Sequence, residues 1–164
     1  MFSKKNSSHS IWTTLAILSS IATISMYTET MLLPALPQLI HEFNLSYSTS
    51  SWILSAYLVA GAVMTPVSGK LSDMYGKKRI MLILILIYTV GLIISPFSSN
   101  FVMLLVSRIL QGIGISVFPV SFGLIREQFP REKLAISQGI ISSMFAGGSV
   151  LGLAIGGTIV QFYA

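Results

Sequence analysis

The chain has 164 residues, of which 53% are hydrophobic and only 9% are charged, and its mean hydropathy is +0.80. In a water-soluble domain of this size, about a quarter of the residues are charged. The composition therefore excludes a globular domain with a polar surface and indicates a lipid environment. The net charge of +5 is compatible with nucleic-acid binding, but the bases lie in clusters between apolar segments and form no amphipathic basic face, which excludes that class.

Catalytic and metal-binding patterns are absent from the sequence. There is no cysteine, which excludes disulfides and thiolate metal sites. His9 and His41 lie far apart without a ligand spacing, and no nucleophile–base pair or phosphate-binding loop is present. We therefore expect neither an enzyme nor a bound cofactor or metal.

Five apolar stretches follow a short polar tail at residues 1–10. They cover residues 11–40, 52–68, 80–97, 101–124 and 134–163. About 17–25 residues cross a hydrocarbon layer of about 30 Å as a helix, and the run "IMLILILIY" lacks the alternation of a membrane β-strand. The sequence predicts an all-α membrane protein, a multi-pass bundle of five transmembrane helices.

The first stretch resembles a signal peptide because Lys4 and Lys5 precede it. Its apolar core is interrupted by threonine and serine, no small-residue cleavage site follows, and uncharged sequence continues to Glu29. We therefore expect an uncleaved first span.

The bases predict the orientation of the chain. The loops after the first and third stretches contain no Lys or Arg, and nine of the ten bases fall on the other side. These are Lys4, Lys5, Lys70, Lys77, Lys78, Arg79, Arg126, Arg131 and Lys133. Because basic loops stay in the cytoplasm, we expect a cytoplasmic amino terminus and a location in the cell membrane.

The segment "GKLSDMYGKKR" places one acid and four bases between the second and third stretches. We expect Gly69 to end a helix where a neighbour approaches closely, and Gly76 to permit a left-handed turn. Asp73 can pair with a base or face the positive end of another helix. The sequence thus predicts a conformational latch that opens when helices tilt. It consists of Gly69, Asp73, Gly76, Lys77, Lys78 and Arg79.

Two charges lie inside the apolar stretches, and a charge in the membrane interior is expensive and commonly functional. At 1.5 Å per residue, Glu29 lies about 24 Å above Thr13, and Arg108 lies about 20 Å from the inner face. We expect the two to meet, so that Glu29 exchanges a proton and Arg108 adjusts its proton affinity. The alternatives are that Glu29 faces water at the outer end of its helix and that Arg108 binds backbone carbonyls.

Glycines and large flexible side chains suggest two further features. Gly148, Gly152 and Gly156 recur every four residues and predict a helix face without side chains, which another helix can approach closely. The interface between the two helices could be pliable and permit rocking, or it could be ordinary tight packing. A substrate cavity for greasy molecules could be lined by soft or aromatic side chains, unless these face lipid. The candidates are Met26, Tyr27, Met31, Trp52, Tyr57 and Met64.

Three segments together resemble the major facilitator superfamily. "GKLSDMYGKKR" resembles its loop 2–3 signature, and "LVSRILQGIGIS" resembles its fourth-helix motif through Arg108, Gln111 and Gly112. "GSVLGLAIGG" resembles the fifth-helix motif of its drug/proton antiporters, with Gly148, Gly152, Gly156 and Gly157 in place, although Leu153 stands where that motif has proline. "LLPALP" resembles the end of the first helix in the same branch, where Thr28 occupies the position of an acid.

This resemblance implies a secondary transporter with twelve or fourteen helices, of which this chain would be the amino-terminal part. The implied activity is proton-coupled export of hydrophobic or cationic small molecules. The implied partners are the substrate, protons, the lipid bilayer and the remaining helices of the full-length transporter. A sugar or metabolite importer of the same fold, and a truncated remnant without transport activity, remain alternatives.

Overall fold

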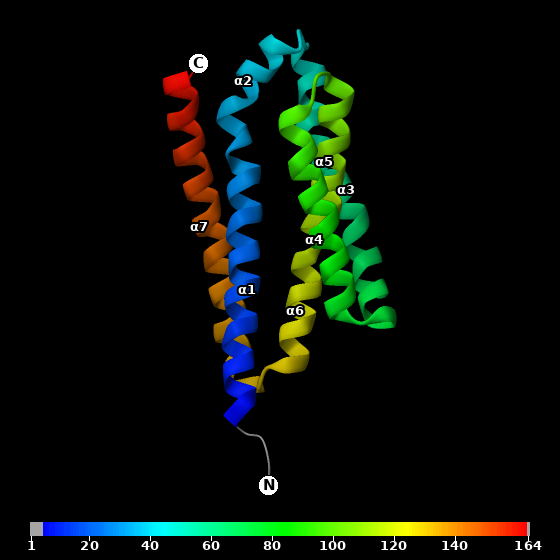
Figure 1. The fold of residues 1–164 in the computed structure, drawn as a ribbon, viewed down its shortest axis with the longest axis vertical. Helices are drawn as coiled ribbons and strands as arrows, with labels where there is room; N and C mark the ends of the chain where they lie inside the picture. The colour runs from blue at the N-terminus through cyan, green and yellow to red at the C-terminus, as the bar shows by residue number, and fades with distance from the viewer. Residues whose placement is uncertain (1–4, 164) are drawn as a thin grey trace. The chain divides into compact units, whose positions relative to one another are not determined.

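A computed structural model describes the backbone of residues 5–163 and the side chains of residues 11–162. The described backbone forms seven α-helices and one short 3-10 helix, η1 (Figure 1). They are α1 (Lys5–Thr30), α2 (Leu32–Glu42), α3 (Tyr47–Tyr75), α4 (Lys77–Ile94), η1 (Ser95–Phe97), α5 (Phe101–Ile115), α6 (Val117–Gln128) and α7 (Arg131–Tyr163).

Five segments of the described chain are long and apolar enough to cross a membrane, which confirms the expected all-α membrane fold. They are Ile11–Glu42, Tyr47–Tyr75, Lys77–Phe97, Phe101–Gln128 and Arg131–Phe162. The second begins earlier and ends later than expected, and its start is capped by the Ser46 hydroxyl, which accepts from the Thr49 amide at 3.1 Å. Helix α1 already begins at Lys5, whereas the first apolar span begins at Ile11. Residues 1–4 lie outside the described chain.

Two of the spans are broken, and each break lies four residues before a proline. Helix α1 ends at Thr30 before Pro34, and α5 ends at Ile115 before Pro119. Proline has no N–H to donate to the carbonyl four residues earlier, and its ring presses against that carbonyl. The first and fourth spans are therefore each two helices, α1–α2 and α5–α6, rather than the single helices expected from their apolar length.

The helices group into two compact units, each described here by itself. Unit 1 comprises Met1–Leu36 and Ile125–Ala164, and unit 2 comprises Pro37–Leu124.

In unit 1, α1 and α7 run parallel and side by side (Figure 1). The Lys133 ammonium lies 5.6 Å from the centre of the Trp12 ring near the start of both helices. Further along, the Thr30 hydroxyl donates to the Ser149 carbonyl at 3.0 Å. Hydroxyl-to-carbonyl bonds of this kind hold membrane helices together where the hydrophobic effect cannot.

In unit 2, α5 packs against both α3 and α4. A Cβ added to Gly112 would lie 2.9 Å from the Ala60 Cβ of α3, and one added to Gly114 would meet the Tyr88 ring of α4 at 2.8 Å. The two glycines lie two residues apart on α5, so they serve neighbours on different sides. Small residues at these points allow the three helices to approach closely.

Candidate functional site

The latch segment forms the turn between α3 and α4. Gly76 lies at the reversal of the chain with a φ of +93°, a value that glycine adopts more readily than other residues. Asp73 accepts a hydrogen bond from the Lys77 ammonium, with Oδ1 and Nζ 2.7 Å apart. The acid of the segment therefore pairs with a base of its own hairpin, one of the two arrangements expected.

Gly69 does not have the expected role. Helix α3 continues past it to Tyr75, so Gly69 ends no helix, and a Cβ added there would meet no atom within 4 Å. The helix ends only at Gly76, whose amide donates to the Ser72 carbonyl at 3.0 Å. Residues 70–75, which lie between the two glycines, continue the helix. Gly69 therefore does not act as a helix stop.

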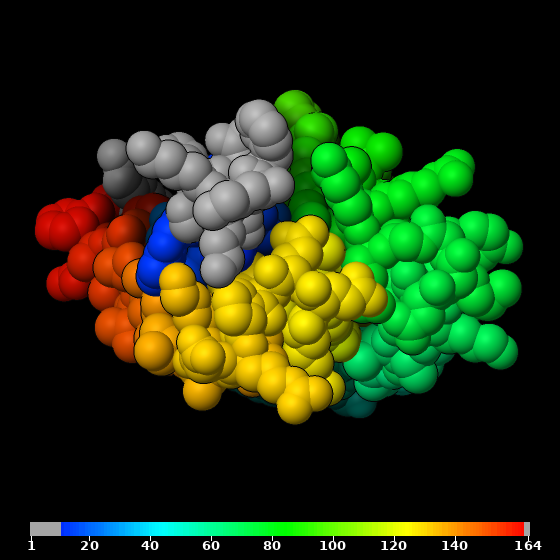
Figure 2. All heavy atoms as spheres, turned by 90° about the horizontal axis from the view of Figure 1, so that it is seen from below, coloured from blue at the N-terminus to red at the C-terminus, as the bar shows by residue number. Residues whose placement is uncertain are grey.

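The other bases of the segment surround the ion pair. Lys70, Lys78 and Arg79 are exposed, as is Asp73 at 71% of its side chain. Figure 2 looks onto this end of the helices, where the side chains of the α3–α4 connection project from the surface. The ion pair thus lies among three further exposed bases.

The fourth-span motif lies at the packed centre of unit 2. Arg108 is only 5% exposed, and Gln111 is buried and donates through Nε2 to the Gly91 carbonyl of α4 at 3.2 Å. Gly112 contacts α3 through the Tyr57 carbonyl. Gln111 and Gly112 therefore fix α5 between its two neighbours and hold the helix that carries Arg108.

The two membrane charges belong to different units. Glu29 is half-buried in the last turn of α1, within unit 1, and Arg108 belongs to unit 2. The expectation that they meet stays a prediction. Thr28, at the position where the resemblance has an acid, donates its hydroxyl to the Ile24 and Ser25 carbonyls of its own helix, both at 3.0 Å.

The glycine-rich face of α7 lies directly on α1. A Cβ on Gly148 would lie 3.0 Å from the Thr23 Cα, one on Gly152 would lie 2.5 Å from the Tyr27 carbonyl oxygen, and one on Gly156 would lie 2.7 Å from the Met31 carbonyl oxygen. Gly157 differs, because a Cβ there would meet no described atom within 4 Å. Gly148 and Gly152 thus contact α1, and Gly156 contacts Met31, which connects α1 to α2.

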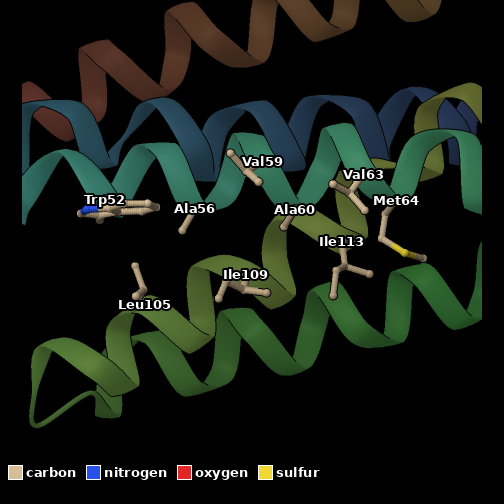
Figure 3. A pocket seen from close by; sticks show the side chains of 9 residues that line it. All are labelled: Trp52, Ala56, Val59, Ala60, Val63, Met64, Leu105, Ile109 and Ile113. Carbon is tan, nitrogen blue, oxygen red and sulfur yellow. The ribbon is translucent and has the colours of Figure 1, made fainter.

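An apolar groove of about 450 Å³ runs between α3 and α5, within the size range of small-molecule sites (Figure 3). The short side chains of Ala56 and Ala60 leave the space, and larger side chains of both helices border it. Its full lining is Trp52, Ala56, Val59, Ala60, Val63, Met64, Leu105, Ile109 and Ile113. No charged residue lines it, so the groove suits a hydrocarbon or aromatic body.

Of the six expected cavity residues, Trp52 and Met64 line the groove, and the other four lie elsewhere. Tyr57 is buried with its carbonyl against Gly112, while the backbones of Tyr27 and Met31 contact α7, and Met26 is buried in α1. None of them lines the groove. The signal that identifies the groove is the pair of alanines one helical turn apart on α3, flanked by valines with the same spacing. The groove forms only because α5 packs opposite these residues, and the sequence does not specify this pairing.

These observations define a multi-pass helical membrane protein with a charged hairpin at one end and an apolar groove between two spans. Comparison with known sequences then identifies the family. The sequence profile of the Major Facilitator Superfamily matches residues 18–164, and the chain belongs to this family.

Several relatives are identical to the chain at about a third of the aligned positions. It is 35% identical over 147 residues to the uncharacterized MFS-type transporter YwoD of Bacillus subtilis (strain 168), which covers 89% of the chain and 32% of that protein. It is 30% identical over 139 residues to Multidrug resistance protein 3 of the same organism, covering 84% of the chain and 27% of the relative. It is 34% identical over 134 residues to the MFS-type transporter ppz2 of Metarhizium majus (strain ARSEF 297), and the alignment covers 81% of the chain and 23% of the relative. The chain thus spans about a third or less of the length of these relatives.

Proposed function

We propose that this chain forms the amino-terminal part of a secondary transporter that exports hydrophobic or cationic small molecules in exchange for protons. The observation that carries the proposal is the family match over residues 18–164. The relatives are about three times as long, which leaves room for the further helices that alternating access requires.

The broken spans support a transport role. Transporters commonly build their binding sites beside discontinuous helices, where freed backbone groups face a cavity. Pro34 and Pro119 remove the helical donors for the carbonyls of Thr30 and Ile115. Glu29 directly precedes the first of these carbonyls, which supports its assignment to a polar site within the first span.

Two observations support export of greasy molecules over import of a sugar. The groove between α3 and α5 offers no hydrogen-bonding side chain apart from the Trp52 indole, so it would leave the hydroxyls of a sugar without partners. The likeness to Multidrug resistance protein 3 points in the same direction.

In the proposed mechanism Glu29 carries the proton. The ionised carboxylate attracts a cationic substrate, and protonation removes that charge, so that proton and substrate exclude each other from the site. Arg108 would favour the ionised state wherever the transport cycle brings it near. The pair of Asp73 and Lys77 would hold the α3–α4 hairpin in one state and release it in the other.

The test is dye efflux driven by a pH gradient in vesicles that contain the full-length protein. Glu29→Gln is expected to abolish the dependence of efflux on the gradient and to weaken the binding of a cationic dye, because glutamine mimics the protonated acid. Glu42→Gln is the matched control, because Glu42 is exposed at the end of α2, and it should behave as wild type. Gradient-driven efflux by Glu29→Gln would refute proton carriage by Glu29. Accumulation instead of efflux would assign an importer, and inactivity of the wild-type protein would support a remnant.

A further inference from the structure

The side chain of Lys77 lies on a glycine of α6. A Cβ added to Gly123 would lie 2.7 Å from the Lys77 Cε, 3.5 Å from its Cδ and 3.9 Å from its Nζ. The missing side chain of Gly123 therefore leaves the space that the end of the lysine occupies. Both residues belong to unit 2.

This contact explains an asymmetry in the ion pair. The Lys77 side chain is only 13% exposed, whereas that of Asp73 is 71% exposed. An exposed lysine samples many rotamers, and holding it in an ion pair costs most of what the pair gains. Lys77 instead lies with its stem along a protein surface while its ammonium reaches the carboxylate, as amphipathic side chains commonly do.

We propose that Gly123 is a positioning residue of the latch, which allows Lys77 to reach Asp73. The latch then has a third element: besides the α3–α4 hairpin it includes α6, the second half of the broken fourth span. The effect of this residue on transport rests on the proposed function, whereas its effect on Lys77 does not.

A methyl group at position 123 would act on the ion pair and spare the fold. The atom it meets is near the free end of a flexible side chain, so the lysine can move away without a backbone shift. Alanine also favours a helix over glycine, which opposes any loss of α6. The displaced ammonium would then move into solvent, away from Asp73.

The first experiment measures the reactivity of the lysine amine in the full-length protein. Brief acetylation followed by mass spectrometry gives the modification of Lys77 relative to Lys78, its exposed neighbour, which serves as an internal reference. Gly123→Ala is expected to raise this ratio roughly threefold, in line with the loss of a weak ion pair. Gly139→Ala is the matched control, since a Cβ there meets no described atom within 4 Å. An unchanged ratio in Gly123→Ala would overturn the proposal.

The second experiment compares single and double variants in the efflux assay. Gly123→Ala is expected to slow efflux in the wild-type background and to have no further effect when Lys77 is already alanine, because interacting residues are not additive. Equal effects in both backgrounds would show that Gly123 does not act through Lys77. A raised acetylation ratio with normal efflux would support the positioning and refute the latch role in transport. If Gly123→Ala fails to fold, recovery of folding in the double variant with Lys77→Ala would support the same contact, and continued failure would refute it.

Discussion

At the scale of single residues, glycines of the same motif differ in their surroundings. Gly152 lies where α7 touches α1, so close that an added Cβ would meet the Thr30 hydroxyl and the Tyr27 carbonyl. Gly157 lies on a face where an added Cβ would meet no described atom within 4 Å. The motif therefore mixes a glycine that the α1–α7 contact requires with one that this contact does not.

This difference predicts opposite outcomes for one substitution. Gly152→Ala forces α7 away from α1 and should destabilise the protein by about 1–3 kcal/mol, the usual cost of overpacking. Gly157→Ala adds a methyl group in open space and should leave stability unchanged or slightly raised through helix propensity. Thermal unfolding in detergent, followed by fluorescence-detected gel filtration, measures both. Equal midpoints for the two variants would contradict the assigned contact.

At the scale of helices, prolines decide where the spans break. The breaks after Thr30 and Ile115 both lie four residues before a proline, but Pro66 lies inside the uninterrupted helix α3. The Thr65 hydroxyl donates to the Gly61 carbonyl near Pro66 at 2.8 Å, which shows that side chains take part in the local bonding there. A proline in an apolar span of this chain is therefore not sufficient for a break.

Replacement of Pro119 tests the origin of the second break. Pro119→Ala restores an N–H that can donate to the Ile115 carbonyl, and proline costs a helix interior about 3 kcal/mol relative to alanine. We expect a more stable protein in which α5 and α6 join, with slower amide hydrogen exchange at residues 116–120. Efflux should fall if the break is needed for movement, since rigidity is commonly gained at the expense of activity. Unchanged exchange at these residues would mean that another interaction causes the break.

Several features of the helices could be predicted from the sequence alone. Apolar length and the charged loops predicted five helical spans, because a membrane imposes both. The position of Gly76 at the reversal was also predictable, since few other residues tolerate its φ. The extension of α3 past Gly69, the groove opposite Ala56 and the contact of Gly123 with Lys77 were not, because each depends on a neighbouring helix or on cooperative continuation of a helix. The sequence periodicity of one span does not specify which other helix packs against it.

At the scale of the whole molecule, the basic residues mark helix ends within each unit. In unit 1, Arg131 and Lys133 lie at the start of α7, the end at which the parallel helix α1 also begins. In unit 2, Lys78 and Arg79 follow the turn from α3 to α4, whereas Ser98, Ser99 and Asn100 connect η1 to α5 at the opposite end without a charge. Because basic loops are retained in the cytoplasm, unit 1 predicts that α1 and α7 begin on the cytoplasmic side, and unit 2 predicts a cytoplasmic turn between α3 and α4.

This orientation can be measured directly, because residues 1–164 contain no cysteine and an introduced one is a unique label among them. In intact cells, a membrane-impermeant maleimide should label Ser99→Cys, an exposed residue of the uncharged connection, and should reach Lys78→Cys only after permeabilisation. The unmodified chain is the control for background labelling. Labelling of Lys78→Cys in intact cells would reverse the orientation. It would then place the Asp73–Lys77 pair on the outer face, where the latch would have to close against substrate entering from outside, and the proposed export direction would fail with it.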